Sequence, residues 1–404
     1  MIKRELYMER IRPFIGKELI KVMTGFRRSG KSVMLQLIQD ELAAQGVQKQ
    51  QFISFNFEKM GFEHLCSAKA LHDEVMRLAA DIDGKVYLFF DEIQEVRSWE
   101  KCVNSLRVDL NCDIYITGSN AKLLSGELAT YLGGRYVEFI IYPFSFAEFR
   151  ELYLSAYPDA SDTDCFNKYL VTGGMPYLSN LDYEDEPSRL YLEDLYNSVV
   201  LKDIVKRNTV RDVDLLEKII AYVTANIGTT FSATSISKFF KSENRTVATE
   251  TILNYIKYCL DAYLFYQVKR EDLAGKQILS VNEKYYISDH GLREAVFGGN
   301  TRDINLILEN MVYMELLRRG YRVTVGRLGD REIDFVCQKQ SQRIYVQVTY
   351  ILASAETVER EFGVLEQIPD NFPKYVVSMD EPDMSRNGIK HFNIRKFLTM
   401  DKWD

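Results

Sequence analysis

Short hydrophobic runs alternate with amphipathic stretches along residues 1–145 of the 404-residue chain. The runs near residues 19–24, 85–90 and 113–117 are almost continuously apolar, which is typical of parallel strands that helices cover on both faces. Residues 51–57 instead alternate apolar and polar side chains, as a strand does when one face is buried. The pattern predicts an α/β fold built on a parallel sheet.

A glycine-rich segment separates the first expected strand from an amphipathic helix, and it comprises Gly25, Phe26, Arg27, Arg28, Ser29, Gly30, Lys31, Ser32 and Val33. Its spacing, G-x-x-x-x-G-K-S, is that of a phosphate-binding loop. Backbone N–H groups in such a loop converge on a polyphosphate together with the helix dipole. Lys31 would contact the β- and γ-phosphates, and the Ser32 hydroxyl would bind Mg²⁺. We therefore expect ATP and Mg²⁺ as cofactors.

Two carboxylates follow the apolar run at residues 85–90. Asp91 and Glu92 fall at the expected carboxyl end of that strand, which is the edge where open α/β sheets bind ligands. Asp91 would complete the Mg²⁺ shell, and Glu92 could act as a general base toward the attacking water. A strand with a solvated cap is the alternative for this pair taken alone.

Further candidate residues come later or lie within the loop. Asn120 follows the strand at residues 113–117, where an amide can orient the lytic water or sense the γ-phosphate, with an ordinary turn as the alternative. Arg135 could stabilise transition-state charge as an arginine finger, in cis or across a subunit boundary, or pair with a local carboxylate. Arg27 and Arg28 could contact phosphate, a neighbouring acid or a partner.

The motifs TGFRRSGKS, LFFDEIQ, ITGSN, LGGRY, YPFSFAEF and TGGMPY follow one another in this chain. In that order the sequence resembles prokaryotic AAA-type P-loop ATPases that are similar to archaeal and origin-recognition ATPases. The resemblance covers nearly the full chain, but it supplies no established substrate. The resemblance implies that Lys31 and Ser32 belong to Walker A and that Asp91 and Glu92 belong to Walker B. It also implies that Asn120 is sensor 1 and that Arg135 takes a finger-like position.

Helical periodicity dominates after residue 145, and three helical patterns followed by two strand patterns begin near residue 211. Three helices and a hairpin predict a winged-helix arrangement, whose third helix could enter a DNA major groove. Basic residues there are diluted by acids, so protein contact or plain packing competes with DNA binding. We expect four parts: a core at residues 1–145, a helical lid at 146–210, a winged-helix domain at 211–300 and a small mixed α/β domain at 301–404.

The last expected domain resembles the restriction-endonuclease-like fold, in whose PD-(D/E)xK members an Asp and a Glu hold a divalent metal and a Lys assists the attacking water. Asp334 matches the first carboxylate. Gln347 and Thr349 stand where an acid and a lysine are expected, which removes a charge from a hard-cation site and the ammonium beside it. We predict the fold without efficient nuclease activity; a plain mixed α/β cap is the alternative.

Composition limits the choice of partner. The net charge is −7, so any nucleic-acid contact has to come from a local basic patch. The six cysteines are scattered without C-x-x-C pairs, and no stretch approaches the ~18 apolar residues of a membrane span. These features predict a cytoplasmic protein without a membrane partner.

The leading hypothesis is a Mg²⁺-dependent ATPase coupled to a DNA or protein partner, with oligomerisation left open. One alternative is a nucleotide-regulated DNA- or protein-binding switch with slow hydrolysis. Another is an ATP-coupled nuclease, which Gln347 and Thr349 disfavour. GTP is less favoured than ATP because no N-K-x-D tetrapeptide follows the sensor strand.

Overall fold

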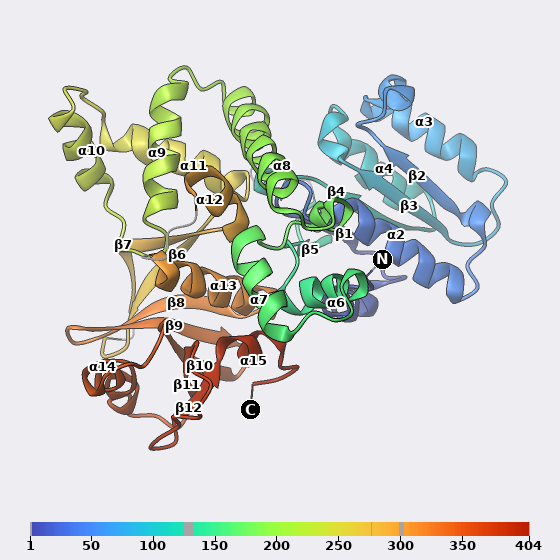
Figure 1. The fold of residues 1–404 in the computed structure, drawn as a ribbon. Helices are drawn as coiled ribbons and strands as arrows, with labels where there is room; N and C mark the ends of the chain where they lie inside the picture. The colour runs from blue at the N-terminus through green and yellow to red at the C-terminus, as the bar shows by residue number, and fades with distance from the viewer. Residues whose placement is uncertain (1, 125–131, 276, 299–302, 404) are drawn as a thin grey trace. The chain divides into compact units, whose positions relative to one another are not determined.

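The computed structural model describes residues 2–124, 132–275, 277–298 and 303–403. The chain forms two compact units (Figure 1). Unit 1 consists of Met1–Pro143 with Asp261–Tyr263, and unit 2 of Phe144–Leu260 with Leu264–Asp404.

Unit 1 is a parallel α/β sheet with flanking helices, as the sequence predicted. Its helices and strands are α1 (Glu5–Ile11), β1 (Ile20–Thr24), α2 (Lys31–Ala44), β2 (Phe52–Asn56), α3 (Ala68–Ala79), β3 (Val86–Asp91), α4 (Trp99–Asp109), β4 (Cys112–Thr117) and β5 (Tyr136–Ile140). Short 3-10 turns lie at Arg12–Phe14, Lys49–Gln51, Met60–Leu65, Ile93–Glu95 and Ala121–Leu124. Among the described residues the sheet has five strands in the order β2-β3-β4-β1-β5.

Every neighbouring pair in this sheet is parallel. The carboxyl ends of the strands therefore share one edge, where β1 leads into the glycine-rich loop and β3 ends at Asp91. The helix α4 and the strand β5 go beyond the elements that the sequence pattern predicted.

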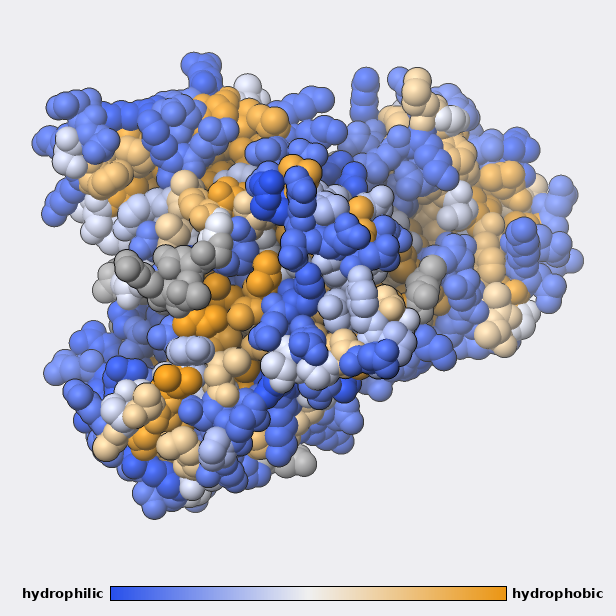
Figure 2. All heavy atoms as spheres, viewed as in Figure 1, coloured by the Kyte–Doolittle hydropathy of each residue, from blue (hydrophilic) through white to orange (hydrophobic). Residues whose placement is uncertain are grey.

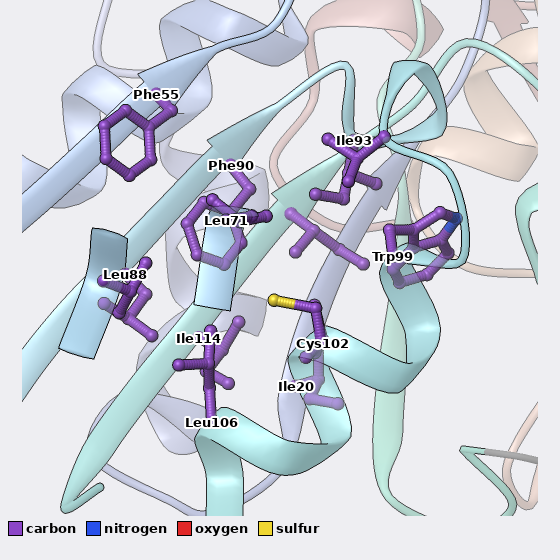
Figure 3. Packing of buried hydrophobic residues seen from close by; sticks show 14 of the residues in the cluster. Ile20, Phe55, Leu71, Leu88, Phe90, Ile93, Trp99, Cys102, Leu106 and Ile114 are labelled. Atoms are coloured by element: carbon purple, nitrogen blue, oxygen red, sulfur yellow. The ribbon is translucent and has the colours of Figure 1, made fainter. Parts of the chain in front are cut away.

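A hydrophobic core fixes the central strand β3. Figure 3 shows a cluster contributed by strands and by α3 and α4, which includes Phe55, Leu71, Leu88, Phe90, Cys102, Leu106 and Ile114. The adjacent Phe89 is also fully buried, and its ring stacks on that of Tyr115 with 4.8 Å between centroids. Burying one such side chain contributes about 1.5–3 kcal/mol. Because both faces of β3 are covered, the position of its carboxyl end is tightly defined.

Unit 2 contains helices followed by a second, mixed sheet. Its elements are α6 (Phe146–Ala156), α7 (Asp162–Thr172), a 3-10 turn (Pro176–Leu181), α8 (Asp185–Ser198), a π-helical segment (Val199–Lys206), α9 (Val213–Ala225), α10 (Ala233–Ser242), α11 (Thr249–Asp261), β6 (Phe265–Asp272), β7 (Gln277–Ile287), α12 (His290–Phe297), α13 (Ile304–Arg318), β8 (Arg322–Leu328), β9 (Arg331–Lys339), β10 (Gln342–Val348), α14 (Ala355–Glu366), β11 (Lys374–Ser378), β12 (Lys390–Asn393) and α15 (Ile394–Thr399). The last residue of α11, Asp261, is counted with unit 1.

The sheet of unit 2 has seven strands within the described ranges, in the order β12-β11-β10-β9-β8-β6-β7. The hairpin β6–β7 is antiparallel, and β6 pairs in parallel with β8. The hairpin expected to end a winged-helix domain is thus continuous with the strands expected in the next domain. The boundary predicted near residue 300 therefore falls inside one sheet.

The TGGMP motif is buried where α7 packs against α12 within unit 2. The N–H of Gly174 donates to Asp289 Oδ2 at 2.7 Å, just before α12. Gly173 has φ +70°, and a Cβ there would lie 2.1 Å from Asp289 Oδ1. Burial raises the pKa of Asp289, whereas the N–H donors of Gly174 and Gly291 lower it. The two glycines are thus explained by close packing of α7 against α12.

No helix in the described ranges is long and apolar enough to cross a membrane. Figure 2 shows one face of the molecule, on which hydrophilic side chains predominate and hydrophobic ones form separate patches.

Candidate nucleotide-binding site

The loop between β1 and α2 depends on two glycines. Gly25 has φ +136°, and a Cβ there would lie 2.2 Å from the carbonyl oxygen of Ile141, which follows β5. Gly30 has φ +101° and caps the amino end of α2. Side chains are strained at such φ values, and at residue 25 there is also no room for one. These two glycines hold the loop tight against the sheet.

Lys31, the first residue of α2, folds back over the loop. Its Nζ donates to the carbonyl oxygens of Gly25 at 3.2 Å and Phe26 at 3.1 Å, and the residue is only 3 % exposed. The same Nζ lies 4.0 Å from Glu92 Oε1, across from the end of β3. A buried ammonium therefore stands at the loop, between carbonyl oxygens and a carboxylate.

Asp91 ends β3 and is buried among hydroxyl and amide donors. Thr117 Oγ1 donates to its Oδ1 at 2.5 Å, and Asn56 Nδ2 donates to its Oδ2 at 2.7 Å. Burial raises the pKa of Asp91, whereas hydrogen bonds from Thr117 and Ser32 lower it. The Ser32 hydroxyl and the Asp91 carboxylate are thus in contact, and both are hard oxygen ligands of the kind that Mg²⁺ prefers.

Glu92 turns away from the strand in a left-handed conformation, with φ 53°. Its N–H donates to Thr117 Oγ1 at 2.9 Å, and its carboxylate accepts from the Gln94 side-chain amide. The side chain is 13 % exposed and approaches Lys31. We call Lys31, Ser32, Asp91 and Glu92 the loop cluster; the structure brings all four to one edge of the sheet.

Asn120 and Arg135 lie at opposite edges of the sheet of unit 1. Asn120 is buried three residues beyond the end of β4, which lies between β1 and β3, so it belongs to the edge that carries the loop cluster. Arg135 directly precedes β5, whose register with β1 pairs Ile20 with Tyr136. It therefore lies at the opposite edge, one strand length of about 16 Å away.

This placement disfavours the cis alternative for Arg135, because the side chain starts at the opposite end of the sheet from its own loop. Arg135 is exposed and donates to Asn104 Oδ1 at 3.1 Å. Contact across a subunit boundary, or a purely local role, remains compatible with its position.

The two loop arginines also differ. Arg27 lies 3.3 Å from Glu58 Oε1, beyond β2, which matches the neighbouring-acid alternative for this residue. Arg28 is exposed and has φ 61°. Among the other loop residues, Phe26 and Ser29 are fully buried, whereas Val33 is exposed on α2.

Sequence reasoning missed Asn56, Thr117 and Gln94. The first two are the last residues of β2 and β4, the strands on either side of β3. Polar residues that close hydrophobic strands were therefore an available signal, but the order of the strands was needed to connect them to Asp91. Gln94 stands two residues after Glu92, inside the DEIQ motif itself.

A second group of charged residues lies in unit 2, and we call Lys284, Glu309, Glu332 and Asp334 the Lys284 cluster. Lys284 Nζ lies 3.0 Å from Glu309 Oε1 and 2.8 Å from Glu332 Oε1. Burial alone would lower the pKa of Lys284, but the carboxylates of Glu309, Asp334 and Glu332 raise it above its ordinary value. The ammonium therefore stays charged among its carboxylates.

Asp334 is held by neighbouring backbone and side-chain groups. Its Oδ2 accepts from the N–H of Val348 at 2.8 Å, and its own N–H donates to Gln347 Oε1 at 3.0 Å. Burial and the nearby Glu309 raise its pKa, while Lys284 lowers it. Thr349 is buried and adds no charge. Within the described ranges, no group of three or more His, Cys, Asp or Glu side chains is arranged to hold a metal ion.

Comparison with known proteins agrees with the architecture of unit 1. Residues 17–150 match the family model described as an AAA domain, and residues 163–303 match a domain of unknown function, DUF8612. The match covers the parallel sheet and the glycine-rich loop of unit 1, and it supports the AAA-type resemblance that the sequence motifs carried.

The chain is 38% identical to an uncharacterized protein of Haemophilus influenzae, over 94% of this chain and 93% of that protein. It is 31% identical to uncharacterized protein MJ1544 of Methanocaldococcus jannaschii, over 86% and 78% of the two chains. The protein belongs to the family of these two relatives.

Solved structures with some similarity include the Aeropyrum pernix ORC1 protein in complex with DNA, at 12% identity, with 72% of this chain and 91% of that chain covered and a TM-score of 0.31. The Thermotoga maritima RuvB Holliday junction branch migration motor is 16% identical, with 65% and 87% covered and a TM-score of 0.34.

Proposed function

We propose that the protein binds ATP with Mg²⁺ at the loop cluster and hydrolyses it. The observation that carries this proposal is the meeting of four groups at one sheet edge: Ser32 contacts Asp91, and Lys31 lies 4.0 Å from Glu92. Phosphoryl transfer needs little covalent chemistry from the protein, so positioning and charge stabilisation by such groups are what the reaction requires.

Each residue has a distinct role in the proposed reaction. The amides of Gly25–Ser32 and the ammonium of Lys31 would bind the β- and γ-phosphates. Ser32 and Asp91 would hold Mg²⁺, which neutralises developing charge on the phosphates. Glu92 would accept the proton of the attacking water, because its carboxylate is partly exposed beside Lys31.

Asn120 would sense the γ-phosphate from the end of β4. Arg135 would act only on a nucleotide in a neighbouring subunit, since it starts from the opposite edge. This part of the proposal requires an oligomer, so Arg135→Ala should reduce turnover in the assembled protein and not in isolated monomers. A loss that is independent of protein concentration would contradict the trans role.

Phosphate release from ATP, measured with Mg²⁺ and after chelation of Mg²⁺, tests the proposed activity. We expect release with Mg²⁺ and its loss on chelation, with ATP preferred over GTP. Absence of release with every nucleotide, despite tight ATP binding, would favour the nucleotide-regulated switch.

The helices α9–α11 and the hairpin β6–β7 support a winged-helix part, which we propose couples the ATPase to a partner. Arg245 forms ion pairs of 2.6 Å with Asp212 and 2.5 Å with Asp214, which engages its guanidinium. The exposed positions of α11 are Glu250, Leu253, Asn254 and Lys257, without net charge. These observations favour a protein partner over a DNA backbone.

Hydrolysis measured with and without duplex and single-stranded DNA across salt concentrations distinguishes the two kinds of partner. A phosphate-backbone contact must weaken as salt rises. We expect no salt-dependent stimulation; stimulation by DNA that disappears at high salt would support DNA coupling instead.

The C-terminal strands and α13 support a restriction-endonuclease-like part without cutting activity. Lys284 pairs with the nearby Glu309, Asp334 accepts from the N–H of Val348, and Gln347 accepts from the N–H of Asp334. Six free thiols agree with the proposed cytoplasmic location. The full division into core, lid, winged-helix and endonuclease-like parts belongs to this proposal.

A further inference from the structure

Gln94 lies on the 3-10 turn Ile93–Glu95, directly after the end of β3. The left-handed backbone at Glu92 reverses the chain, which brings the Gln94 side chain against the Glu92 carboxylate. Its Nε2 donates to Glu92 Oε2. Because a carboxylate only accepts hydrogen bonds, the nitrogen of the amide has to face Glu92 and the oxygen has to point elsewhere.

That oxygen is the unusual atom. Gln94 Oε1 is buried and has no hydrogen-bond partner among the residues that the structure describes. A Cβ at residue 118 would lie 2.8 Å from it, so the absence of a side chain on Gly118 leaves room for the amide. Buried acceptors are normally satisfied, and an exception next to a reactive group needs an explanation.

We propose that Gln94 is a positioning residue for hydrolysis: its N–H holds the Glu92 carboxylate and its Oε1 accepts a hydrogen bond from the attacking water. This inference rests on the proposed ATPase function. One O–H proton of the water passes to Glu92 as the water oxygen attacks the γ-phosphorus and the bond to the ADP oxygen breaks. The second O–H donates to Gln94 Oε1, and the proton on Glu92 returns to solvent with phosphate release.

An amide suits this position because it both donates and accepts. A leucine at residue 94 would keep much of the volume but lose both hydrogen bonds. A glutamate would keep the shape but lose the N–H donor and place a second carboxylate against Glu92, which like charges would push away from its position. The two substitutions therefore fail in different and measurable ways.

The test is steady-state ATP hydrolysis with ATP binding measured in parallel. For Gln94→Leu we expect kcat to fall about 100-fold, as for loss of other preorganised hydrogen-bond partners, with the ATP Kd changed less than threefold. For Gln94→Glu we expect kcat to fall at least as far, because the variant lacks the N–H donor and repels the Glu92 carboxylate. Gln36→Leu, which removes an exposed amide that bonds Asp40 on α2, is the matched control and should leave kcat unchanged.

Gly118→Ala tests the position of the same Gln94 amide without changing residue 94. Its Cβ would also meet Leu123 Cδ2 at 2.7 Å, so we expect displacement of both neighbours and a fall in kcat in the same direction as for Gln94→Leu.

The outcomes separate this inference from the function on which it rests. If the wild type does not hydrolyse ATP, the proposed function fails. If the wild type is active and Gln94→Leu keeps its kcat within threefold, the role of Gln94 is wrong while the function stands. Should Gln94→Leu not fold, Gln94→Glu decides, and a kcat within threefold of wild type would overturn the proposal.

Discussion

The loop cluster of unit 1 and the Lys284 cluster of unit 2 contain similar groups in different arrangements. Each has a buried lysine beside carboxylates carried on or near strands. Lys31 Nζ donates to two backbone carbonyl oxygens and lies 4.0 Å from Glu92. Lys284 Nζ instead makes close ion pairs with Glu309 and Glu332, at 3.0 and 2.8 Å.

The difference shows why residue types alone do not define a site. In the loop, Lys31 donates hydrogen bonds to two neutral carbonyl oxygens, and a phosphate could replace these acceptors. In the Lys284 cluster the carboxylates already have a cation, and a divalent metal would have to displace it. Breaking such a buried pair leaves an unpaired charge, which costs more than the pair itself contributes. On the proposed function, similar groups would thus bind a phosphate in unit 1, whereas in unit 2 the lysine pairs with the chain's own carboxylates.

The largest effect is expected from breaking the Lys284 cluster. Lys284→Met leaves buried carboxylates unpaired and should lower the free energy of unfolding by about 3–5 kcal/mol, measured by urea denaturation. Adding Glu309→Gln should restore part of that loss, because it removes one of the uncompensated charges. Equal free energies of unfolding for wild type and Lys284→Met would show that the Lys284 cluster does not stabilise the fold.

Breaking the loop cluster should affect binding and not folding. Lys31→Ala removes the ammonium that faces the phosphates, and we expect ATP affinity to fall at least ~100-fold, or about 2.7 kcal/mol, in calorimetry. Lys69→Ala is the control, since Lys69 is exposed and paired with Asp73 on α3. Retained affinity in Lys31→Ala would contradict the assignment of the phosphate site.

A smaller effect is expected from the hydroxyl that joins Asp91 to Glu92. Thr117→Val keeps the shape but removes the Oγ1 that donates to Asp91 and accepts from the Glu92 N–H. Loss of these bonds should lower kcat about 10-fold, or ~1.4 kcal/mol. Thr399→Val, at an exposed hydroxyl in unit 2, should not change kcat. An unaffected Thr117→Val enzyme would mean that these bonds do not position the site.

No effect is expected from Asp334→Ala on DNA integrity. Wild type and variant should both leave duplex DNA intact with Mg²⁺ or Mn²⁺, assayed by gel electrophoresis. Metal-dependent cutting by the wild type that disappears in the variant would contradict this prediction. It would mean that the Lys284 cluster is an active site and not only a structural ion-pair cluster.

The parallel sheet and the loop cluster were predictable because they rest on local patterns. Lys31 and Ser32 belong to one short motif, and Asp91 and Glu92 directly follow an apolar run. The partners Asn56 and Thr117 were not predictable in the same way, since their contacts depend on β2 and β4 flanking β3. The position of Arg135 likewise needed the direction of β5 beside β1.

The Lys284 cluster was harder to foresee from the sequence. Asp334, Gln347 and Thr349 predicted a depleted metal site, whereas Lys284, which belongs to the same cluster, comes from β7, an element expected in another domain. Pairing of β6 with β8 brings that hairpin into the C-terminal sheet. Such long-range pairing is set by tertiary packing, which hydrophobic periodicity does not report.

Phosphate release by Glu92→Gln tests the central claim most directly. The substitution keeps the size of the side chain and one oxygen that can accept from Gln94 but removes the carboxylate that would accept a proton. We predict ATP binding within threefold of wild type and phosphate release at least ~100-fold slower at saturating ATP with Mg²⁺. Release at the wild-type rate would contradict hydrolysis at the loop cluster with Glu92 as the base.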